Sequence, residues 1–245
     1  MDEKKSLIAL DAGNTSLKLG VFINGELNDV FRIKPDELTT WKRNHAEYHD
    51  LQMVVSSVLD NFLQEKINLV FSKVHFLSQQ DSMPFTNAYT TPLTLGMDRM
   101  CNVAAVINEN ENHPKLVVDI GTCIKIDLLD KNKCYNGGSI SPGLRLRFNS
   151  LHQETARLPL LEVTQEDIPL IGSSTSGSIL SGVQNGMQFE INGMIDAYRS
   201  LYPDLTIFVT GGDSSFFDFE GKNDIFVDEN LTLKGIYKIY SLHAH

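Results

Sequence analysis

Two stretches of the chain share one pattern of apolar and polar positions. In the first, an apolar run over residues 7–10 ends in Asp11, and apolar positions alternate with polar ones from residue 17 to residue 22. In the second, an apolar run over residues 116–118 ends in Asp119, and the alternation resumes at residue 124. Alternation with a period of two is typical of a half-buried strand. Each stretch therefore predicts a β-hairpin whose first strand ends in an aspartate.

The turns of both predicted hairpins contain Asp-Xaa-Gly followed by a threonine. Thr15 lies four residues after Asp11 and Thr122 three residues after Asp119, so the two copies are similar but not identical. A glycine such as Gly13 lets the backbone approach a ligand closely, and successive turn amides can form a nest that binds an anion. Either hairpin alone is equally consistent with an ordinary surface turn. The repetition favours two similar domains that face each other across a nucleotide.

The remaining positions predict further strands and helices. The Asn24-Gly25 pair is typical of a hairpin turn and leads to a third strand that ends at residue 33. The first half then continues with a helix from Pro35, a strand over 51–58, a helix over 61–66 and a strand over 70–77. Together with the first three strands these elements give a β-β-β-α-β-α-β order, and a helix over 100–108 follows. The second half is predicted to contain a turn within 132–140, a helix over 144–158, a loop over 172–179 that caps a helix running to about 198, a strand over 205–209 and a helix over 231–240.

Composition and charge narrow the class of protein. The chain has 245 residues, 42% of them hydrophobic, enough for one large or two modest domains. Its formal net charge of −10 argues against nucleic-acid binding as the main role, which needs clustered Lys and Arg. No apolar run approaches the roughly 20 residues of a membrane span, and the N-terminal residues lack the apolar segment of a signal peptide. The three cysteines have no metal-like spacing, so we expect a cytoplasmic protein with reduced thiols.

The segment Gly96-Met97-Asp98-Arg99 is the candidate for acid–base chemistry. It follows a polar loop rich in hydroxyl groups and lies at the start of the predicted helix over 100–108. Asp98 is either a helix cap or first-turn acid that the helix dipole stabilises, or a carboxylate that takes a proton from a substrate. Arg99 is either a solvated side chain or the partner of Asp98.

Two segments of the second half carry weaker signals. The hydroxyl residues within 173–176 stand where such side chains usually cap a helix, although they can also reach a ligand there. The sequence Thr210-Gly211-Gly212 follows a predicted buried strand and lets the backbone lie flat against a nucleoside.

Taken in order, these motifs closely resemble those of the type III pantothenate kinases, over nearly the whole chain. The segments that carry the resemblance are Asp11-Xaa-Gly13-Asn14-Thr15 with Lys18, Gly96-Xaa-Asp98-Arg99, Asp119-Xaa-Gly121-Thr122, Gly137-Gly138-Xaa-Ile140-Xaa-Pro142-Gly143, Thr155-Ala156-Arg157-Leu158-Pro159, Gly172-Xaa-Xaa-Thr175 and Thr210-Gly211-Gly212. Each motif alone is weak, but the ordered set is specific.

The resemblance implies a fold, a reaction and a set of cofactors. The fold would be α/β, with two similar ribonuclease H-like (actin-like ATPase) domains over residues 1–112 and 113–245, each a mixed five-stranded sheet with helices. The reaction would be ATP-dependent phosphorylation of pantothenate to 4′-phosphopantothenate, the first step of coenzyme A biosynthesis. It would use Mg²⁺ and a monovalent cation, K⁺ or NH₄⁺. The enzyme would be a homodimer whose interface helps to shape the substrate site.

The resemblance also implies a role for individual residues. Asp98 would be the general base, Asp119 would bind the monovalent cation, and Asp11 would bind Mg²⁺. The ATP-binding residues would be Asp11, Ala12, Gly13, Asn14, Thr15, Ser16, Leu17, Lys18, Thr122, Thr210, Gly211 and Gly212. The pantothenate-binding residues would be Tyr89, Gly96, Met97, Asp98, Arg99 and Thr175.

A few residues depart from the family pattern, and two other functions stay open. Cys123 and Ile124 stand where Ala or Thr and a smaller or polar residue are expected, and Met97 stands where Ala or Val is commoner. These departures bear on nucleotide affinity rather than on the class of reaction. The alternatives are a kinase of the same superfamily that acts on a sugar or a carboxylate, and a non-catalytic regulatory relative. The presence of Asp11, Asp98 and Asp119 weighs against the second.

Overall fold

The computed structural model describes residues 5–13, 16–57, 61–219 and 224–242. These residues form two compact units. The first unit comprises Met1–Glu111, Asn132–Asn136 and Asn230–His245, and the second comprises Asn112–Lys131 and Gly137–Glu229. The chain therefore leaves the first unit and returns to it twice.

The first unit is built on a five-stranded mixed sheet. Its strands are β1 (Leu7–Ala12), β2 (Leu17–Ile23), β3 (Glu26–Ile33), β4 (Gln52–Ser57) and β5 (Val74–Phe76), in the order β3-β2-β1-β4-β5. The first three strands are antiparallel, whereas β4 and β5 run parallel to β1 and to each other. The predicted β-β-β-α-β-α-β order is confirmed. The predicted strand over 70–77 is too long, because Val70 still belongs to a helix and β5 has three residues.

The turn between β2 and β3 confirms the hairpin that Asn24-Gly25 predicts. Asn24 has a φ of 50° and Gly25 a φ of 85°, the two consecutive positive values that a type I′ turn requires. The Gly25 amide also donates to the Lys5 carbonyl oxygen at 3.0 Å. The local sequence thus aligns β3 on β2.

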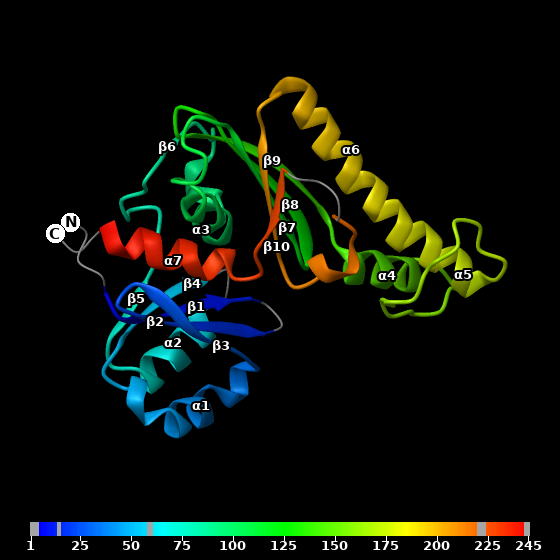
Figure 1. The fold of residues 1–245 in the computed structure, drawn as a ribbon. Coiled ribbons are helices and arrows are strands. Elements are labelled where there is room, and N and C mark those ends of the chain that lie inside the picture. Colours follow the sequence, from blue (N-terminus) through cyan, green and yellow to red (C-terminus); the bar gives the residue numbers. More distant parts are fainter. Residues whose placement is uncertain (1–4, 14–15, 58–60, 220–223, 243–245) are drawn as a thin grey trace. The chain divides into compact units, whose positions relative to one another are not determined.

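Helices cover both faces of this first sheet (Figure 1). The helices α1 (Leu38–Asn44) and α2 (Asn61–Val70) pack on the face that carries Ile8, Leu10 and Val55. The helices α3 (Met97–Ala105) and α7 (Leu231–Leu242) cover the other face and contact each other along their lengths. Short 3-10 turns over Pro35–Glu37, Ala46–Tyr48 and Pro92–Thr94 connect the elements.

The position of α7 differs from the predicted division at residues 112 and 113. A methyl group on Gly235 would overlap the carbonyl oxygen of Cys101 on α3, so the two helix backbones touch at that point. Leu233 of α7 lies over Gly20 of β2, where an added Cβ would be 2.8 Å from the leucine Cδ1. The last helix therefore packs as part of the first unit, although the sequence division assigned it to the second.

The other large sheet is ordered β11-β10-β7-β8-β9, with the two-residue β6 (Thr86–Asn87) at its edge. β6 and the first residues of β9 belong to the first unit, and the rest of the sheet belongs to the second. The other strands of this sheet are β7 (Lys115–Ile120), β8 (Cys123–Leu129), β9 (Cys134–Pro142), β10 (Thr206–Thr210) and β11 (Ile225–Val227). The β7–β8 pair is antiparallel, whereas β10 is parallel to β7 and to β11. The predicted turn over 132–140 is wrong, since a strand runs from Cys134 to Pro142.

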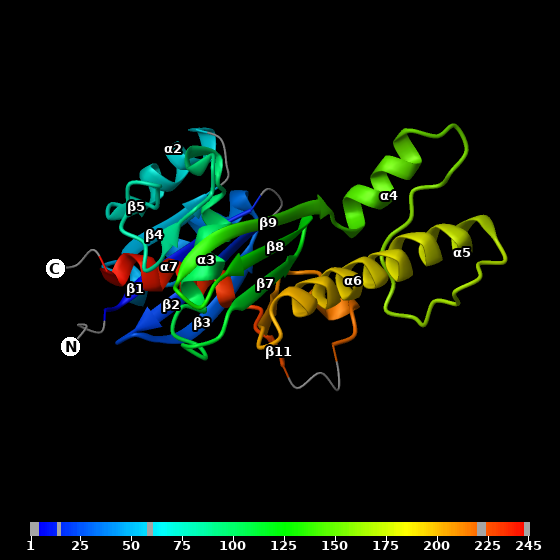
Figure 2. The same cartoon turned by 90° about the horizontal axis from the view of Figure 1, so that it is seen from above.

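The helices of the second unit are α4 (Leu144–Gln153), α5 (Thr175–Leu180) and α6 (Gly186–Leu201), shown in Figure 2. A π-helical turn over Ser181–Asn185 joins α5 to α6, and a 3-10 turn covers Ser214–Phe216. One sheet face packs on these helices through Leu116, Val118 and Ile126. Ser174 caps α5 as predicted, because its Oγ accepts a hydrogen bond from the Gly177 amide at 3.0 Å. Over the described residues no helix combines the length and apolarity that a bilayer crossing needs.

Candidate active site

The first predicted hairpin places three polar residues in one row. Asp11 near the end of β1 lies opposite Lys18 on β2 and Ser56 on β4. Directly opposite residues on neighbouring strands point to the same face of a sheet, which here is the face under α3 and α7. Below the tip, the Gly13 amide donates to the Ser16 carbonyl oxygen at 3.2 Å.

Several of the predicted ATP-binding residues are either outside the residues that the structure describes or buried in the core of the first unit. Asn14 and Thr15 lie outside the described residues. Ala12 is 1% exposed and Leu17 is fully buried in the core of the first unit, so neither side chain can reach a nucleotide. The accessible ATP-binding candidates among the described residues of the first hairpin are Gly13, Ser16 and the partly exposed Asp11 and Lys18.

Asp98 lies in the first turn of α3, because this helix begins three residues earlier than predicted. Gly96 is the N-cap residue, with an extended φ of −61° and ψ of 135°, and Asp98 is the acidic residue of the first turn. The helix dipole stabilises a carboxylate at this position. A methyl group on Gly96 would overlap Asp98 Oδ1, so the carboxylate folds back over the glycine.

The thiol of Cys101 shows that Asp11 and Asp98 lie in one region of the first unit. Complete burial raises the pKa of Cys101 well above its ordinary value, while the neighbouring Ser56 hydroxyl acts in the opposite direction. The carboxylates of Asp11, Asp98 and Asp81 raise this pKa further. Cys101 lies one turn after Asp98 on α3 and next to Ser56, which is opposite Asp11, so the two aspartates predicted to hold the metal and to act as base lie on the same side of the first sheet.

Arg99 is buried against two tyrosines rather than solvated. Its side chain is 4% exposed, and its Cζ lies 5.7 Å from the centre of the Tyr89 ring and 6.0 Å from that of the Tyr135 ring. A guanidinium group over an aromatic face is attracted by the quadrupole of the ring. Tyr135, fully buried on β9, was missed by sequence reasoning, because nothing in the chain near it indicates its contact with Arg99.

The side chains of the other substrate-binding candidates differ in access. Tyr89 and Gly96 are partly exposed in the first unit, whereas Met97 is 5% exposed. Any contact from Met97 to a substrate would therefore use its backbone. Thr175 is exposed on α5 and belongs to the second unit.

The second predicted hairpin repeats the arrangement of the first. Asp119 on β7 lies opposite Lys125 on β8, and Lys125 Nζ donates to Asp119 Oδ2 at 2.9 Å. On the other side of β7, Asp119 is in register with Thr210 of β10. Lys125 was missed by sequence reasoning, although the spacing of Lys18 from Asp11 would have indicated it.

Two glycines close on the tip of this second hairpin. Gly211 has a φ of 101° and lies against Ile120, where a side chain would overlap the isoleucine carbonyl oxygen. The Gly143 amide donates to the Thr122 carbonyl oxygen at 3.0 Å. Thr122 is exposed, but Thr210 is 1% exposed, so only the backbone of Gly211 and Gly212 offers a surface to a nucleoside.

The departures from the family pattern have a structural role. Ile124 is 1% exposed and packs in the core of the second unit, and Cys123 is half-buried with a free thiol. Ile124 therefore points away from the face that carries Asp119 and Lys125, since side chains alternate along a strand.

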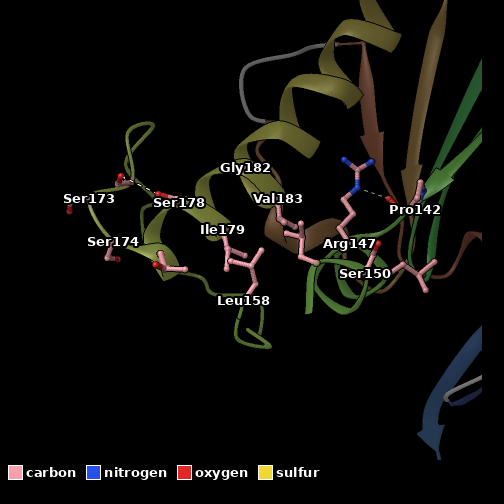
Figure 3. Close-up of a pocket in the computed structure, with 14 residues that line it drawn as sticks. Pro142, Arg147, Ser150, Leu158, Ser173, Ser174, Ser178, Ile179, Gly182 and Val183 are labelled. Atoms are coloured by element: carbon pink, nitrogen blue, oxygen red, sulfur yellow. Dashed lines mark hydrogen bonds between the residues drawn. The ribbon is translucent and has the colours of Figure 1, made fainter. Parts of the chain in front are cut away.

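A groove of about 1340 Å³ lies among α4, α5 and the π-helical turn of the second unit (Figure 3). Thr175 lines it, together with Leu146, Arg147, Ile179 and Val183. Arg147 is held by its Nε, which donates to the Pro142 carbonyl oxygen at 2.8 Å, and by an ion pair with Glu190. Asp119, Thr122 and the Thr210-Gly211-Gly212 segment do not line this groove.

The donor groups present limit the ways in which the chain can hold a metal ion. In the part of the chain that the structure describes, no group of three or more His, Cys, Asp or Glu side chains could hold a metal ion. Mg²⁺ in phosphoryl-transfer sites is usually held by one or two carboxylates together with the phosphates of the substrate. A single accessible carboxylate such as Asp11 fits that mode.

Comparison with known proteins agrees with the geometry. The sequence profile of the type III pantothenate kinase family matches residues 7–197. A relative from Flavobacterium johnsoniae described as a type III pantothenate kinase is 41% identical over 96% of this chain and 97% of its own.

Solved structures share the fold at low identity. A Campylobacter jejuni protein assigned to the Baf family has a TM-score of 0.63 at 22% identity, covering 97% of this chain and 98% of its own. A ROK family glucokinase from Streptomyces griseus, solved with glucose and AMPPNP, has a TM-score of 0.50 at 11% identity, over 95% and 98%. The predicted α/β fold with actin-like ATPase domains is thereby confirmed, except that the second sheet has six strands where five were predicted.

Proposed function

The chain belongs to the type III pantothenate kinase family, and from this premise we propose how its residues divide the work of phosphorylating pantothenate with ATP in coenzyme A biosynthesis. Asp98 is the general base that takes the proton of the pantothenate hydroxyl. The observation that carries this assignment is the position of Asp98 in the first turn of α3, one turn before Cys101, whose thiol neighbours Ser56, the residue opposite Asp11 in the sheet. Phosphoryl transfer needs a base and a phosphate-binding group in one place.

The first hairpin is assigned to the ATP phosphates and Mg²⁺. Asp11 holds the metal ion together with the phosphates, and Lys18 binds phosphate oxygens. Gly13, whose amide donates to the Ser16 carbonyl oxygen, lets the phosphates approach the backbone closely. When bound, Mg²⁺ neutralises charge on the phosphates. Asn14 and Thr15, which lie outside the described residues, remain predicted ATP-binding residues.

The second hairpin and its neighbours are assigned to the rest of the nucleotide. Thr122 is exposed at the tip and offers a hydroxyl to a phosphate. The nucleoside lies on the backbone of Gly211 and Gly212, since the side chain of Thr210 is buried. The tight approach of Gly211 to Ile120 explains why a side chain is not tolerated there.

Arg99 and Tyr89 are assigned to the carboxylate end of pantothenate, as the family resemblance implies, and with 4% exposure only a small part of the Arg99 side chain is open to that carboxylate. A guanidinium group recognises a carboxylate with paired hydrogen bonds. The rings of Tyr89 and Tyr135 hold this guanidinium from its sides. Gly96 and the Met97 backbone line the approach to Asp98.

A homodimer completes the proposal, with Thr175 contacting pantothenate from the partner subunit. The support is a set of exposed apolar side chains: Leu146, which lines the groove, and Leu160, Leu170 and Ile171, which lie between α4 and α5, are 40%, 52%, 68% and 86% exposed. Apolar patches of this kind mark interaction sites. A second copy of the chain suits the patch because it would bring its own patch to a two-fold interface.

The monovalent cation is the one predicted cofactor that the described residues do not fit. Its assigned ligand, Asp119, already accepts a hydrogen bond from the Lys125 ammonium group. A cytoplasmic location agrees with the use of ATP and with free thiols at Cys101, Cys123 and Cys134.

The test is ADP release with ATP, Mg²⁺ and pantothenate, compared with reactions that lack one component. We expect release only when all are present. Release with a sugar or acetate in place of pantothenate would indicate the alternative kinase. Nucleotide binding without any release would indicate the non-catalytic relative.

A further inference from the structure

We propose that Lys125 supplies, as a tethered ammonium group, the positive charge that a monovalent cation was expected to supply at Asp119. Turnover is then independent of K⁺ and NH₄⁺. The inference concerns the reaction assigned above and rests on that assignment. Its observation is the contact of 2.9 Å between Lys125 Nζ and Asp119 Oδ2.

The contact is set by the backbone of the β7–β8 hairpin. Asp119 and Lys125 are directly opposite each other in the antiparallel register, so both side chains point to the same face. The flanking pairs, Val118 with Ile126 and Ile120 with Ile124, are buried in the core of the second unit. A slip of this register would move these apolar residues out of the core.

The surroundings of the pair suit a cation that stays in place. The side chains of Lys125 and Asp119 are 22% and 11% exposed, so water screens their attraction only in part. An ammonium ion and a lysine head group carry the same charge and donate N–H groups to the same kind of acceptor. A second cation at Asp119 would meet the repulsion of the first.

The first hairpin has the same design. Lys18 follows Asp11 by seven positions and Lys125 follows Asp119 by six, and the second turn is shorter by one residue. In both hairpins the lysine therefore lies opposite the aspartate in the strand register. A carboxylate beside the phosphates of a nucleotide needs a counter-charge. At Asp11 this charge is assigned to Mg²⁺, with Lys18 on the phosphates, whereas at Asp119 the contact with Lys125 supplies it within the chain.

The first experiment uses the wild-type protein. Pantothenate-dependent ADP release is measured in KCl, NH₄Cl, NaCl and tetramethylammonium chloride at equal ionic strength, which holds the screening constant. We expect rates that agree within about twofold, because the charge is part of the chain. Activation by K⁺ of about tenfold or more over tetramethylammonium, the size expected for a missing electrostatic group, overturns the proposal.

The second experiment removes the ammonium group with Lys125→Met, and uses Lys131→Met as a matched control, since Lys131 is exposed in the same unit. In tetramethylammonium chloride we expect Lys125→Met to lose about tenfold or more in turnover and to regain most of it in K⁺ or NH₄⁺. K⁺ should also raise the melting temperature of Lys125→Met but not that of the wild type or Lys131→Met.

The remaining outcomes are equally decisive. Unchanged turnover of Lys125→Met in every salt overturns the proposal. A folded Lys125→Met protein that loses turnover and does not regain it in K⁺ or NH₄⁺ also overturns it, and would indicate that Lys125 contacts the phosphates. If Lys125→Met does not fold, the wild-type comparison decides. No ADP release from the wild type in any salt would refute the assigned reaction itself, which separates the two failures.

Discussion

At the scale of single residues, Asp98 has two possible tasks that one substitution separates. Its carboxylate folds back over Gly96 at the start of α3, where it both stabilises the helix and faces the region of Asp11. A carboxylate there interacts favourably with the helix dipole. The same position suits a base, because the carboxylate is half-buried rather than fully exposed.

We expect Asp98→Asn to lose roughly 10²- to 10⁴-fold in turnover, because an amide cannot accept the proton of the hydroxyl group. Its melting temperature should stay near that of the wild type, since Asn at a helix start stabilises nearly as well as Asp. ATP affinity, measured by calorimetry, should hardly change, because the phosphates are assigned to other residues. More than about a tenth of wild-type turnover would make Asp98 a helix-stabilising or orienting residue.

Tyr135 is expected to act through Arg99. Tyr135→Leu removes one ring beside the guanidinium, so the KM for pantothenate should rise roughly 2- to 30-fold while kcat and the KM for ATP stay near the wild-type values. Tyr135→Phe keeps the ring and should retain the wild-type KM. An analogue of pantothenate without the carboxylate should show no difference among the three proteins. Equal KM increases for Leu and Phe would contradict the role of the ring.

Single residues differ in how far the sequence indicates their contacts. Asp11 and Asp119 end apolar runs, so their positions at strand ends could be predicted from local pattern alone. Tyr135 could not, because its contact with Arg99 joins residues that are distant in the chain. Lys125 lies in a strand of alternating polar and apolar residues, where a lysine usually faces solvent. Its contact with Asp119 follows from the strand register, which places the two residues opposite each other.

At the scale of elements, the α3–α7 crossing depends on one missing side chain. Gly235→Ala would place a methyl group into the Cys101 carbonyl oxygen, so we expect a loss of about 1–3 kcal/mol in the stability of the first unit. Thermal unfolding checks this as a lower melting temperature. The matched control is Gly193→Ala on α6, where nothing lies within 4 Å of the added Cβ.

Gly193 is exposed in the interior of a helix, so its replacement should stabilise the protein by about 0.5–1 kcal/mol. The two alanine variants should therefore shift the melting temperature in opposite directions. A Gly235→Ala protein as stable as the wild type would show that α3 and α7 can separate without cost.

Elements set by local chemistry were predicted well, and elements set by distant contacts were not. The Asn24-Gly25 turn and the Ser174 cap form from residues next to each other. Gly137 and Gly138 favoured a turn, yet they lie in β9, where a side chain on Gly138 would overlap the Ile126 backbone. Those glycines allow a close strand contact that the sequence around them does not show.

At the scale of the whole molecule, we expect the exposed apolar residues in and next to the groove to be buried against a second copy of the chain. Ile171→Asp places a charge on the most exposed apolar residue of that surface, which a dry interface cannot accommodate. Light scattering of the wild type should give about twice the chain mass of 27.4 kDa. Ile171→Asp should give the mass of one chain and should lose pantothenate turnover, because Thr175 of the partner is then missing.

The control for this experiment is Leu69→Asp on α2 of the first unit, a leucine that is 87% exposed away from the groove residues. We expect it to keep both the dimer mass and the turnover. A wild-type protein with the mass of a single chain at assay concentration would contradict the dimer, and full turnover of Ile171→Asp would contradict the role of Thr175.

The family and the fold class could be predicted because the motifs occur in a fixed order along the chain, and this order survives substitution within each motif. The compact units could not, because a contact such as that of Gly235 with Cys101 joins segments far apart in sequence. Periodicity describes each helix but not the sheet on which it packs.

The return of α7 to the first unit has a consequence for synthesis on the ribosome. Domains usually fold in the order in which they are translated, at about 5–20 residues per second. Here β1 emerges first, but α7, which covers the face of its sheet that carries Leu7 and Ala9, follows more than two hundred residues later. That delay is roughly 10 to 45 s at these rates. All residues of the second unit are translated within it. Until α7 is made, only α3 is available to cover that face, so part of the apolar surface of the first sheet stays open while the later-made unit folds.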